Sequence, residues 1–147
     1  MQTRAAVIYD LGQPTPYAQS RPLRIETIEL QAPGPGEVLV ELVSAGLCHS
    51  DLSVIDGSRP RPMPMVLGHE VAGLVDRVGP GVETLRPGER VAVNPSRPCG
   101  RCRFCQEGAQ NHCLDMHFYG SAMRMPHVHG AFRQLIVTDA GQCHSVG

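Results

Sequence analysis

Apolar residues recur along this chain in short runs that glycine and proline separate. Several runs alternate apolar and polar positions, a period of two that indicates strands with one buried face. The predicted strands are residues 5–10, 23–30, 37–47, 66–78, 89–93 and 131–138. The stretches between them carry the Gly and Pro of turns, chiefly at 32–36, 57–64 and 79–88. The pattern therefore predicts a mainly β, barrel-like domain with long loops.

One stretch departs from the strand pattern. Residues 50–57, SDLSVIDG, predict the beginning of a short helix, with Ser50 placed to cap its N-terminus. No other segment favours a helix, so we expect helices to be few and short.

Length and composition fit one globular domain, because the chain has 147 residues of which 41% are apolar. A net charge of −1 and few aromatic residues exclude the basic, aromatic surface of a nucleic-acid-binding protein. The N-terminus lacks the apolar run of a signal peptide, and no stretch approaches the roughly 20 apolar residues of a membrane span. We therefore expect a cytoplasmic protein with reduced cysteines, and neither a membrane nor a nucleic acid as partner.

Four cysteines lie close together in the segment NPSRPCGRCRFCQEGAQNHC. Their spacing is C-x2-C-x2-C-x7-C, and they are Cys99, Cys102, Cys105 and Cys113. A loop of Gly, Pro and polar residues can wrap four sulfurs around one ion, and a tetrahedral structural zinc fits this pattern best. An iron–sulfur cluster and a set of buried thiols are the alternatives. Ferredoxin motifs continue with x3-C-P, whereas a leucine follows the fourth cysteine here.

A second group of metal-ligand residue types spans the segments SAGLCHSDL and VLGHEVAG. Cys48, His69 and Glu70 offer a thiolate, an imidazole and a carboxylate, which can hold a catalytic zinc with one position open for water or substrate. Adjacent residues of a strand point to opposite faces, so ligation by both His69 and Glu70 requires a local distortion. The flanking Gly68 and Gly73 allow one. Taken singly, a small apolar cysteine and a surface His–Glu pair are the simpler interpretation.

Together these segments carry a family resemblance. The run GHEVAGLVDRVGPGV matches every fixed position of G-H-E-x2-G-x5-G-x2-V, the signature of the zinc-dependent medium-chain dehydrogenases. The matching residues are Gly68, His69, Glu70, Gly73, Gly79 and Val82. The likeness covers essentially the whole chain, which resembles the family's GroES-like (chaperonin-10-like) catalytic β-barrel. Within the family, VNPSRPCGRC, residues 114–132 and AGQCH look most like the L-idonate 5-dehydrogenases; sorbitol and threonine dehydrogenases are the alternatives.

The resemblance implies roles for residues of both segments. In the polyol branch of the family, a Cys and the His and Glu of G-H-E hold the catalytic zinc, and Cys48, His69 and Glu70 stand at those positions. Ser50 stands where the family has a hydroxyl that takes the proton from the substrate alcohol. Asp51 stands where the family has a carboxylate that orients the ligand histidine.

One position departs from the family pattern. Many relatives place a histidine five residues after the ligand cysteine to pass the proton to solvent, and this chain has Ser53 there. Proton exit would then use water or His49, a residue that the resemblance also places near the cofactor phosphates.

The implied reaction interconverts a secondary alcohol of a sugar acid or polyol and its ketone, with L-idonate and 5-keto-gluconate as the expected pair. Zinc as a Lewis acid eases loss of the hydroxyl proton, and a nicotinamide cofactor, NAD or NADP, must accept the hydride because no side chain can. The glycine stretches at 34–39 and 79–84 lack the third glycine of G-x-G-x-x-G, so both are interpreted as turns. The candidates to meet a substrate carboxylate are Arg59, Arg61 and Arg124.

We therefore expect residues 1–147 to form the zinc-binding catalytic domain of a longer, homo-oligomeric enzyme whose cofactor domain follows. Such a portion would bind zinc but not turn over alone. An alternative of another class is a zinc-stabilised β-barrel interaction module without catalysis. The Cys-x-Ser-Asp sequence upstream of G-H-E argues against it, because scaffolding requires only the four-cysteine loop.

Overall fold

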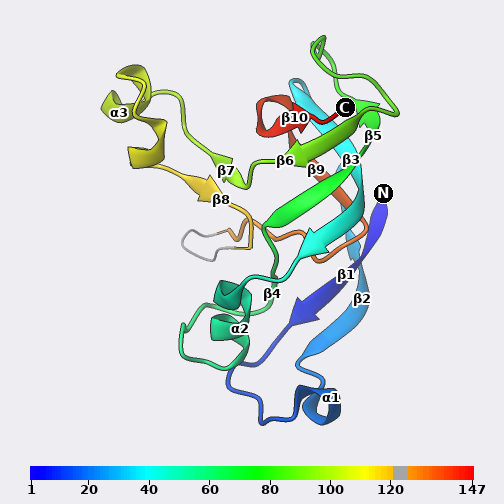
Figure 1. Cartoon of the computed structure of the whole chain (residues 1–147), viewed down its shortest axis with the longest axis vertical. Helices are drawn as coiled ribbons and strands as arrows, with labels where there is room; N and C mark the ends of the chain where they lie inside the picture. Colours follow the sequence, from blue (N-terminus) through cyan, green and yellow to red (C-terminus); the bar gives the residue numbers. More distant parts are fainter. Residues whose placement is uncertain (121–125) are drawn as a thin grey trace.

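The computed structural model describes residues 1–120 and 126–147. Three antiparallel sheets form most of the regular secondary structure in these residues (Figure 1). A three-stranded sheet of order β2-β1-β4 contains β1 (Gln2–Ile8), β2 (Leu23–Glu29) and β4 (Met65–Val66). A five-stranded sheet of order β10-β6-β5-β3-β9 contains β3 (Glu37–Gly46), β5 (Glu70–Val78), β6 (Arg90–Val93), β9 (Leu135–Asp139) and β10 (Cys143–Ser145). The remaining sheet pairs β7 (Ser96–Arg97) with β8 (His117–Phe118).

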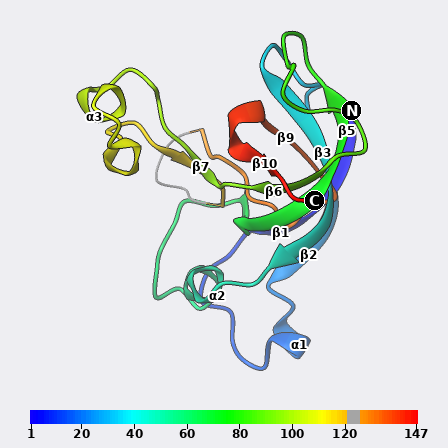
Figure 2. The same cartoon turned by 45° about the horizontal axis from the view of Figure 1, so that its top comes forward.

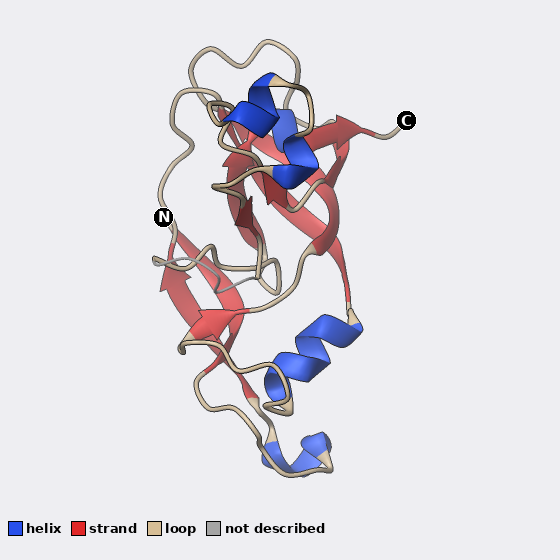
Figure 3. Cartoon of the chain, turned by 90° about the vertical axis from the view of Figure 1, so that its left-hand side faces the viewer, coloured by secondary structure: helices blue, strands red, loops and turns tan. Residues whose placement is uncertain are grey.

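The helices are short and gather toward the two ends of the molecule, with the strands between them (Figure 3). They are α1 (Tyr17–Ser20), α2 (His49–Ile55), α3 (Arg103–Gln106) and the 3-10 helices η1 (Gln110–His112) and η2 (Ala140–Gln142). The predicted mainly β domain with few short helices is thus confirmed. No helix of the described part of the chain is long and apolar enough to cross a membrane.

The strand predicted over 66–78 is interrupted where the chain passes from one sheet to the other. Its first residue, Val66, ends β4 in the three-stranded sheet, residues 67–69 lie in neither sheet, and the rest form β5 in the five-stranded sheet. Gly68, between them, has a φ of +96°. A Cβ there would meet the ring of Phe132, so both the backbone angle and the packing require glycine. The local distortion expected around His69 is therefore present as a corner between the sheets.

The strand predicted over 131–138 is also split at a corner, and β9 begins only at Leu135. Residues 131–134 instead connect the two larger sheets. On one side, the N–H of Ala6 donates to the carbonyl of Phe132 at 2.7 Å. On the other, the N–H of Leu42 donates to the carbonyl of Gln134 at 2.8 Å. The backbone groups of this link are satisfied by both sheets, so it holds the barrel-like arrangement together.

In the described residues, three buried apolar clusters support the sheets, and two of them position the site. The five-stranded sheet buries one whose most buried members, each no more than 1% exposed, are Val38, Val40, Val75, Val91 and Ile136. In the other, Val54 and Ile55 of α2 pack against Ile8, Met65 and Leu67. Burial of each such side chain stabilises the fold by about 1.5–3 kcal/mol, so α2 is fixed beside the corner at Gly68.

The beginning of α2 differs from the prediction. Its N-cap is Cys48, and Ser50 lies inside the first turn. The N–H of Cys48 donates to Oδ2 of Asp51 at 3.1 Å. Ser50 as the cap is wrong because the carboxylate three residues after Cys48 already holds the first turn in place.

The segment from Pro98 to Met116, here called the cysteine lobe, projects from the sheets (Figures 1 and 2). It contains α3 and η1 and is connected to the rest of the chain through β7 and β8. Its backbone turns at Gly100 and Gly108, whose φ angles are +70° and +82°. The four clustered cysteines all lie in this lobe.

Candidate active site and metal centres

Strand pairing brings three potential metal ligands together. In the register of β3 with β5, Gly46 lies opposite Glu70, so the end of one strand adjoins the beginning of the other. Cys48 follows the last residue of β3 by two positions, and His69 immediately precedes β5. One ligand atom from each of Cys48, His69 and Glu70 lies within 4.8 Å of the others. This grouping matches the set expected from the sequence.

Gly46 is a residue of this site that the sequence analysis did not single out. A Cβ at this position would collide with Oε2 of Glu70 and lie 3.0 Å from that residue's own Cβ. Glycine therefore lets the Glu70 carboxylate fold across β3 toward Cys48. The only sequence signal is a glycine two residues before the cysteine, which is too common a feature to identify such a contact.

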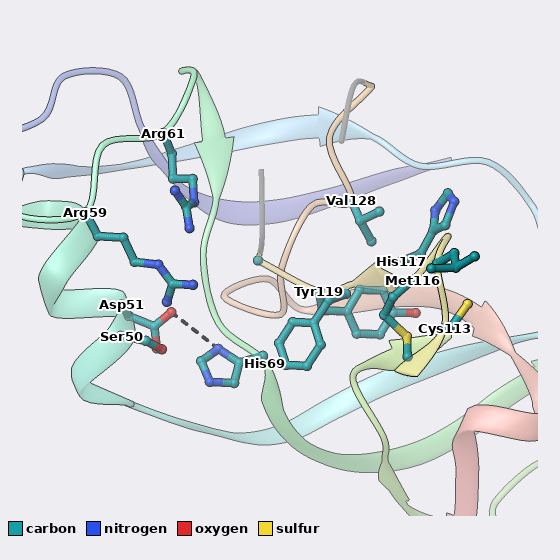
Figure 4. A pocket seen from close by; sticks show the side chains of 13 residues that line it. Ser50, Asp51, Arg59, Arg61, His69, Cys113, Met116, His117, Tyr119 and Val128 are labelled. Atoms are coloured by element: carbon teal, nitrogen blue, oxygen red, sulfur yellow. Dashed lines mark ion pairs between the residues drawn. The ribbon is translucent and has the colours of Figure 1, made fainter. Parts of the chain in front are cut away.

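Asp51 ties the beginning of α2 to the corner loop. Its side chain is buried, and Oδ1 accepts a hydrogen bond from the N–H of Gly68 at 3.0 Å. The same oxygen lies 3.6 Å from Nδ1 of His69, as the dashed line in Figure 4 marks. With Nδ1 facing this carboxylate, Nε2 is the ring nitrogen left for a metal ion. The structure thus places Asp51 beside His69, where the sequence resemblance expected it.

A cavity of about 560 Å³ opens beside this centre. Ser50, Asp51 and His69 line one side of it (Figure 4). Much of the remaining lining is apolar and includes Leu114 and Phe118 from the cysteine lobe and β8. The Phe118 ring lies 5.6 Å from the His69 ring, centroid to centroid. An organic molecule held there would contact both the imidazole and the Ser50 hydroxyl.

His49 and Ser53 lie on α2 but not in the cavity lining. His49 is exposed. The Ser53 hydroxyl donates to the backbone carbonyl of His49 at 3.1 Å, a bond within the helix. The position where many relatives have a histidine is therefore occupied here by a hydroxyl that is bonded to backbone. Arg124, a candidate for a substrate carboxylate, lies outside the described residues.

The cysteine lobe brings its four sulfurs together. Ligand atoms of Cys99, Cys102, Cys105 and Cys113 lie within 4.8 Å of one another, and all four cysteines are free thiols. The sulfur of Cys105 lies 3.5 Å from that of Cys102 and 4.0 Å from that of Cys99. Around a tetrahedral zinc with Zn–S bonds of about 2.3 Å, neighbouring sulfurs are about 3.8 Å apart. These spacings fit one such ion, and they leave no room for a multi-iron cluster.

Backbone N–H groups make the lobe favourable for thiolates. Hydrogen bonds from backbone N–H groups, first that of Leu114, lower the pKa of Cys102 to about 6. The N–H of Arg101 contributes most to a lowered pKa of Cys99. Burial instead raises the pKa of Cys105 to about 12, so this thiol needs a positive ion to ionise at neutral pH.

The family profile "Alcohol dehydrogenase GroES-like domain" matches residues 34–147. This chain belongs to that family. The mainly β, GroES-like fold and the zinc-type alcohol dehydrogenase resemblance expected from the sequence are thereby confirmed.

Two curated relatives show how broad the likeness is. The NDMA-dependent alcohol dehydrogenase of Amycolatopsis methanolica is 43% identical over 113 residues, 77% of this chain and 28% of that protein. L-Idonate 5-dehydrogenase (NAD(P)(+)) of Escherichia coli K12 is 43% identical over 109 residues, 71% of this chain and 31% of that protein. The chain therefore spans about a third of the length of these relatives.

Solved structures agree with this likeness. The crystal structure of Escherichia coli L-idonate 5-dehydrogenase has a TM-score of 0.81 and 34% identity, and covers 100% of this chain and 40% of its own. An alcohol dehydrogenase from Escherichia coli CFT073, solved with NADH, has a TM-score of 0.82 and 34% identity, and covers 99% of this chain and 39% of its own.

Proposed function

We propose that this chain is the zinc-binding catalytic domain of an alcohol or polyol dehydrogenase, with residues 1–147 as one unit. The observation that carries the proposal is the convergence of Cys48, His69 and Glu70, of which His69 also lines the cavity. Sulfur, nitrogen and oxygen donors from three side chains fit a catalytic zinc with an open position. An interaction module of this family would need neither the mixed donor set nor the cavity.

The residues around the centre have separate tasks in the proposed oxidation. A zinc ion held there supplies Lewis acidity, which lowers the pKa of a substrate hydroxyl. The Ser50 hydroxyl lines the cavity and would receive the hydroxyl proton while it passes its own proton on to water or to His49. Asp51 holds His69 in one tautomer and orientation through the contact with Nδ1. The apolar wall around Phe118 excludes water from the reacting carbon.

Oxidation of the alcohol carbon also releases a hydride, and no protein side chain can accept it. We propose NAD or NADP as the acceptor, bound mainly by polypeptide outside these 147 residues. Every strand pairing in the described residues is antiparallel, so they contain no parallel βαβ unit for a dinucleotide. His49, exposed at the beginning of α2, is the residue of this domain proposed to approach the cofactor phosphates.

The cysteine lobe is proposed to hold a second, structural zinc. Four thiolates complete a tetrahedral shell and leave no position for substrate, so this ion would stabilise the lobe rather than react. The lobe supplies Leu114 and Met116 to the wall of the cavity, so the structural ion would also shape the substrate site.

For the substrate, we propose the secondary alcohol of a sugar acid, with L-idonate and 5-keto-gluconate as the pair. Sorbitol- or threonine-type activity is the same-class alternative. Sequence identity does not separate the subgroups, because the NDMA-dependent and L-idonate enzymes are both 43% identical to this chain. The choice is supported by the presence of Escherichia coli L-idonate 5-dehydrogenase among both the curated relatives and the solved structures.

The test is a substrate profile of the zinc-loaded enzyme that contains this chain, measured as NADH or NADPH formation. We expect turnover of L-idonate to exceed that of sorbitol, threonine and ethanol. Ser50→Ala should lower kcat while the bound zinc is retained. No dehydrogenase activity with any of the four alcohols would contradict the proposed function, and a preference for a neutral alcohol would contradict the substrate assignment.

A further inference from the structure

The loop after α2 places two arginines in the wall of the substrate cavity. Arg59 and Arg61 line the same cavity as Ser50 and His69. Figure 4 shows both guanidinium groups pointing into it, on the side of Asp51 and His69. Arg61 is partly buried and Arg59 is exposed, so both can meet a ligand that enters from solvent.

The backbone of this loop is held in place. The N–H of Arg59 donates to the carbonyl of Ser53 in α2 at 2.8 Å. Each of the two arginines precedes a proline, which restricts its backbone to extended conformations. Binding of a ligand to both guanidinium groups would therefore cost little conformational entropy in the loop backbone.

The two positive charges have no protein counter-charge in the described residues. The ion pairs found there are His69–Asp51, Arg77–Asp76 and Arg101–Asp115. Arg61 uses one N–H to reach the carbonyl of Pro60 at 2.9 Å, which leaves other donors available. Asp51, the carboxylate in the cavity lining, already accepts hydrogen bonds from the backbone of Gly68 and Cys48.

We propose that Arg59 and Arg61 form an anion-recognising wall that selects substrates bearing a carboxylate or phosphate monoester. The polyhydroxy chain would then span the cavity, with its anionic end on the guanidinium groups and its reacting hydroxyl at His69 and Ser50. Guanidinium groups suit both anions because their planar N–H donors bind two oxygens at once. This inference rests on the proposed function and names the class of substrate that the site takes.

Direct binding to the zinc-loaded chain tests the proposal. NMR titration at low salt would compare gluconate, sorbitol 6-phosphate and neutral sorbitol as probes. In the wild type, at least one anion should bind about tenfold more tightly than sorbitol, since hydrogen bonds to charged groups exceed neutral ones. Whichever anion binds more tightly identifies carboxylate or phosphate as the group recognised.

Variants then assign the preference to the two arginines. The double variant R59Q/R61Q should bind the anions no better than sorbitol, and its affinity for sorbitol should be unchanged. R59K/R61K should keep part of the preference, because the charge stays. R77Q/R86Q removes the same charge from exposed arginines outside the cavity lining and should behave as the wild type.

Four results would overturn the proposal. The first three are equal binding of all three probes by the wild type, an undiminished preference in R59Q/R61Q, and an equal loss in R77Q/R86Q. The fourth is a variant R59Q/R61Q that loses affinity only for adenosine 2′,5′-bisphosphate, since the wall would then serve the cofactor. Zinc analysis of the same samples reports separately on the proposed function. A normal zinc content without a preference for anions would contradict only the anion-recognising wall and not the proposed function.

Discussion

At the scale of single residues, Gly46 carries a constraint that metal-ligand spacing does not reveal. The missing Cβ is what allows the Glu70 carboxylate to lie over the end of β3. A ligand set therefore depends on a residue that cannot itself bind metal. The geometry of the metal site therefore depends on how closely the backbones of β3 and β5 approach each other, as well as on which ligand residues are present.

Gly46→Ala is expected to displace the Glu70 carboxylate and to weaken zinc binding at Cys48, His69 and Glu70. The reason is the collision of the new Cβ with Oε2, which a rotation of the Glu70 side chain relieves without unfolding the strand. Equilibrium dialysis against zinc should show the loss of one ion per chain at limiting zinc. Gly34→Ala is the matched control, because a Cβ there meets only the end of the Glu37 side chain at 3.3 Å. Equal zinc binding by both variants would refute this role of Gly46.

Asp51→Asn should lower both the stability of the domain and its affinity for zinc at the His69 centre. The buried carboxylate accepts from two backbone N–H groups, and an amide NH2 placed against either one leaves a donor unpaired. We expect a loss of about 1–3 kcal/mol in the free energy of unfolding. Zinc affinity at the His69 centre should fall about 10–100-fold, because His69 loses its orienting carboxylate. Urea denaturation and zinc competition measure the two effects.

The control for Asp51 is Asp56→Asn at the exposed C-cap of the same helix. Its carboxylate accepts from the N–H of Ser58 at 2.8 Å in contact with solvent, so a change below about 1 kcal/mol is expected. If Asp51→Asn and Asp56→Asn had the same free energy of unfolding and the same zinc affinity, the role assigned to Asp51 would be contradicted.

At the scale of elements, the sequence predicted which segments are strands but not where they change sheets. Residues 66–78 are apolar or glycine apart from His69, Glu70, Asp76 and Arg77, and nothing in their periodicity marks the corner at Gly68. That corner depends on Phe132, more than sixty residues away in sequence, whose ring fills the space of the missing Cβ. The same applies to residues 131–134, which bond to both sheets. Such junctions are set by tertiary contacts that a local pattern does not contain.

The cysteine lobe should lose zinc as the pH falls. Zinc binds thiolates, and Cys105, with its pKa raised to about 12, must release a proton when the ion binds near neutral pH. The proton from Cys105 alone should make affinity fall at least about tenfold per pH unit from pH 8 to 6. Below about pH 6 it should fall more steeply, because Cys102, with a pKa of about 6, then also becomes protonated in the free lobe. Competition with a chromophoric chelator measures this, and a flat profile would contradict the assignment.

At the scale of the whole molecule, the chemistry-bearing residues were predictable and their surroundings were not. The spacing of Cys99 to Cys113 and the G-H-E motif identify both candidate ligand sets from the sequence alone. Donor types at short spacing carry that information locally. The cavity, by contrast, draws its walls from α2, the loop at Arg59 and Arg61, and the cysteine lobe. Only the folded chain shows that these distant segments face one reacting position.

The central claim is that two separate ions are held, one by four sulfurs and one by Cys48, His69 and Glu70. The most direct test is elemental zinc analysis after equilibrium dialysis against excess zinc, on the wild type and on Cys48→Ala. We expect two zinc ions per wild-type chain and one per Cys48→Ala chain, with the fold retained in both. The same zinc content in the two proteins would contradict it.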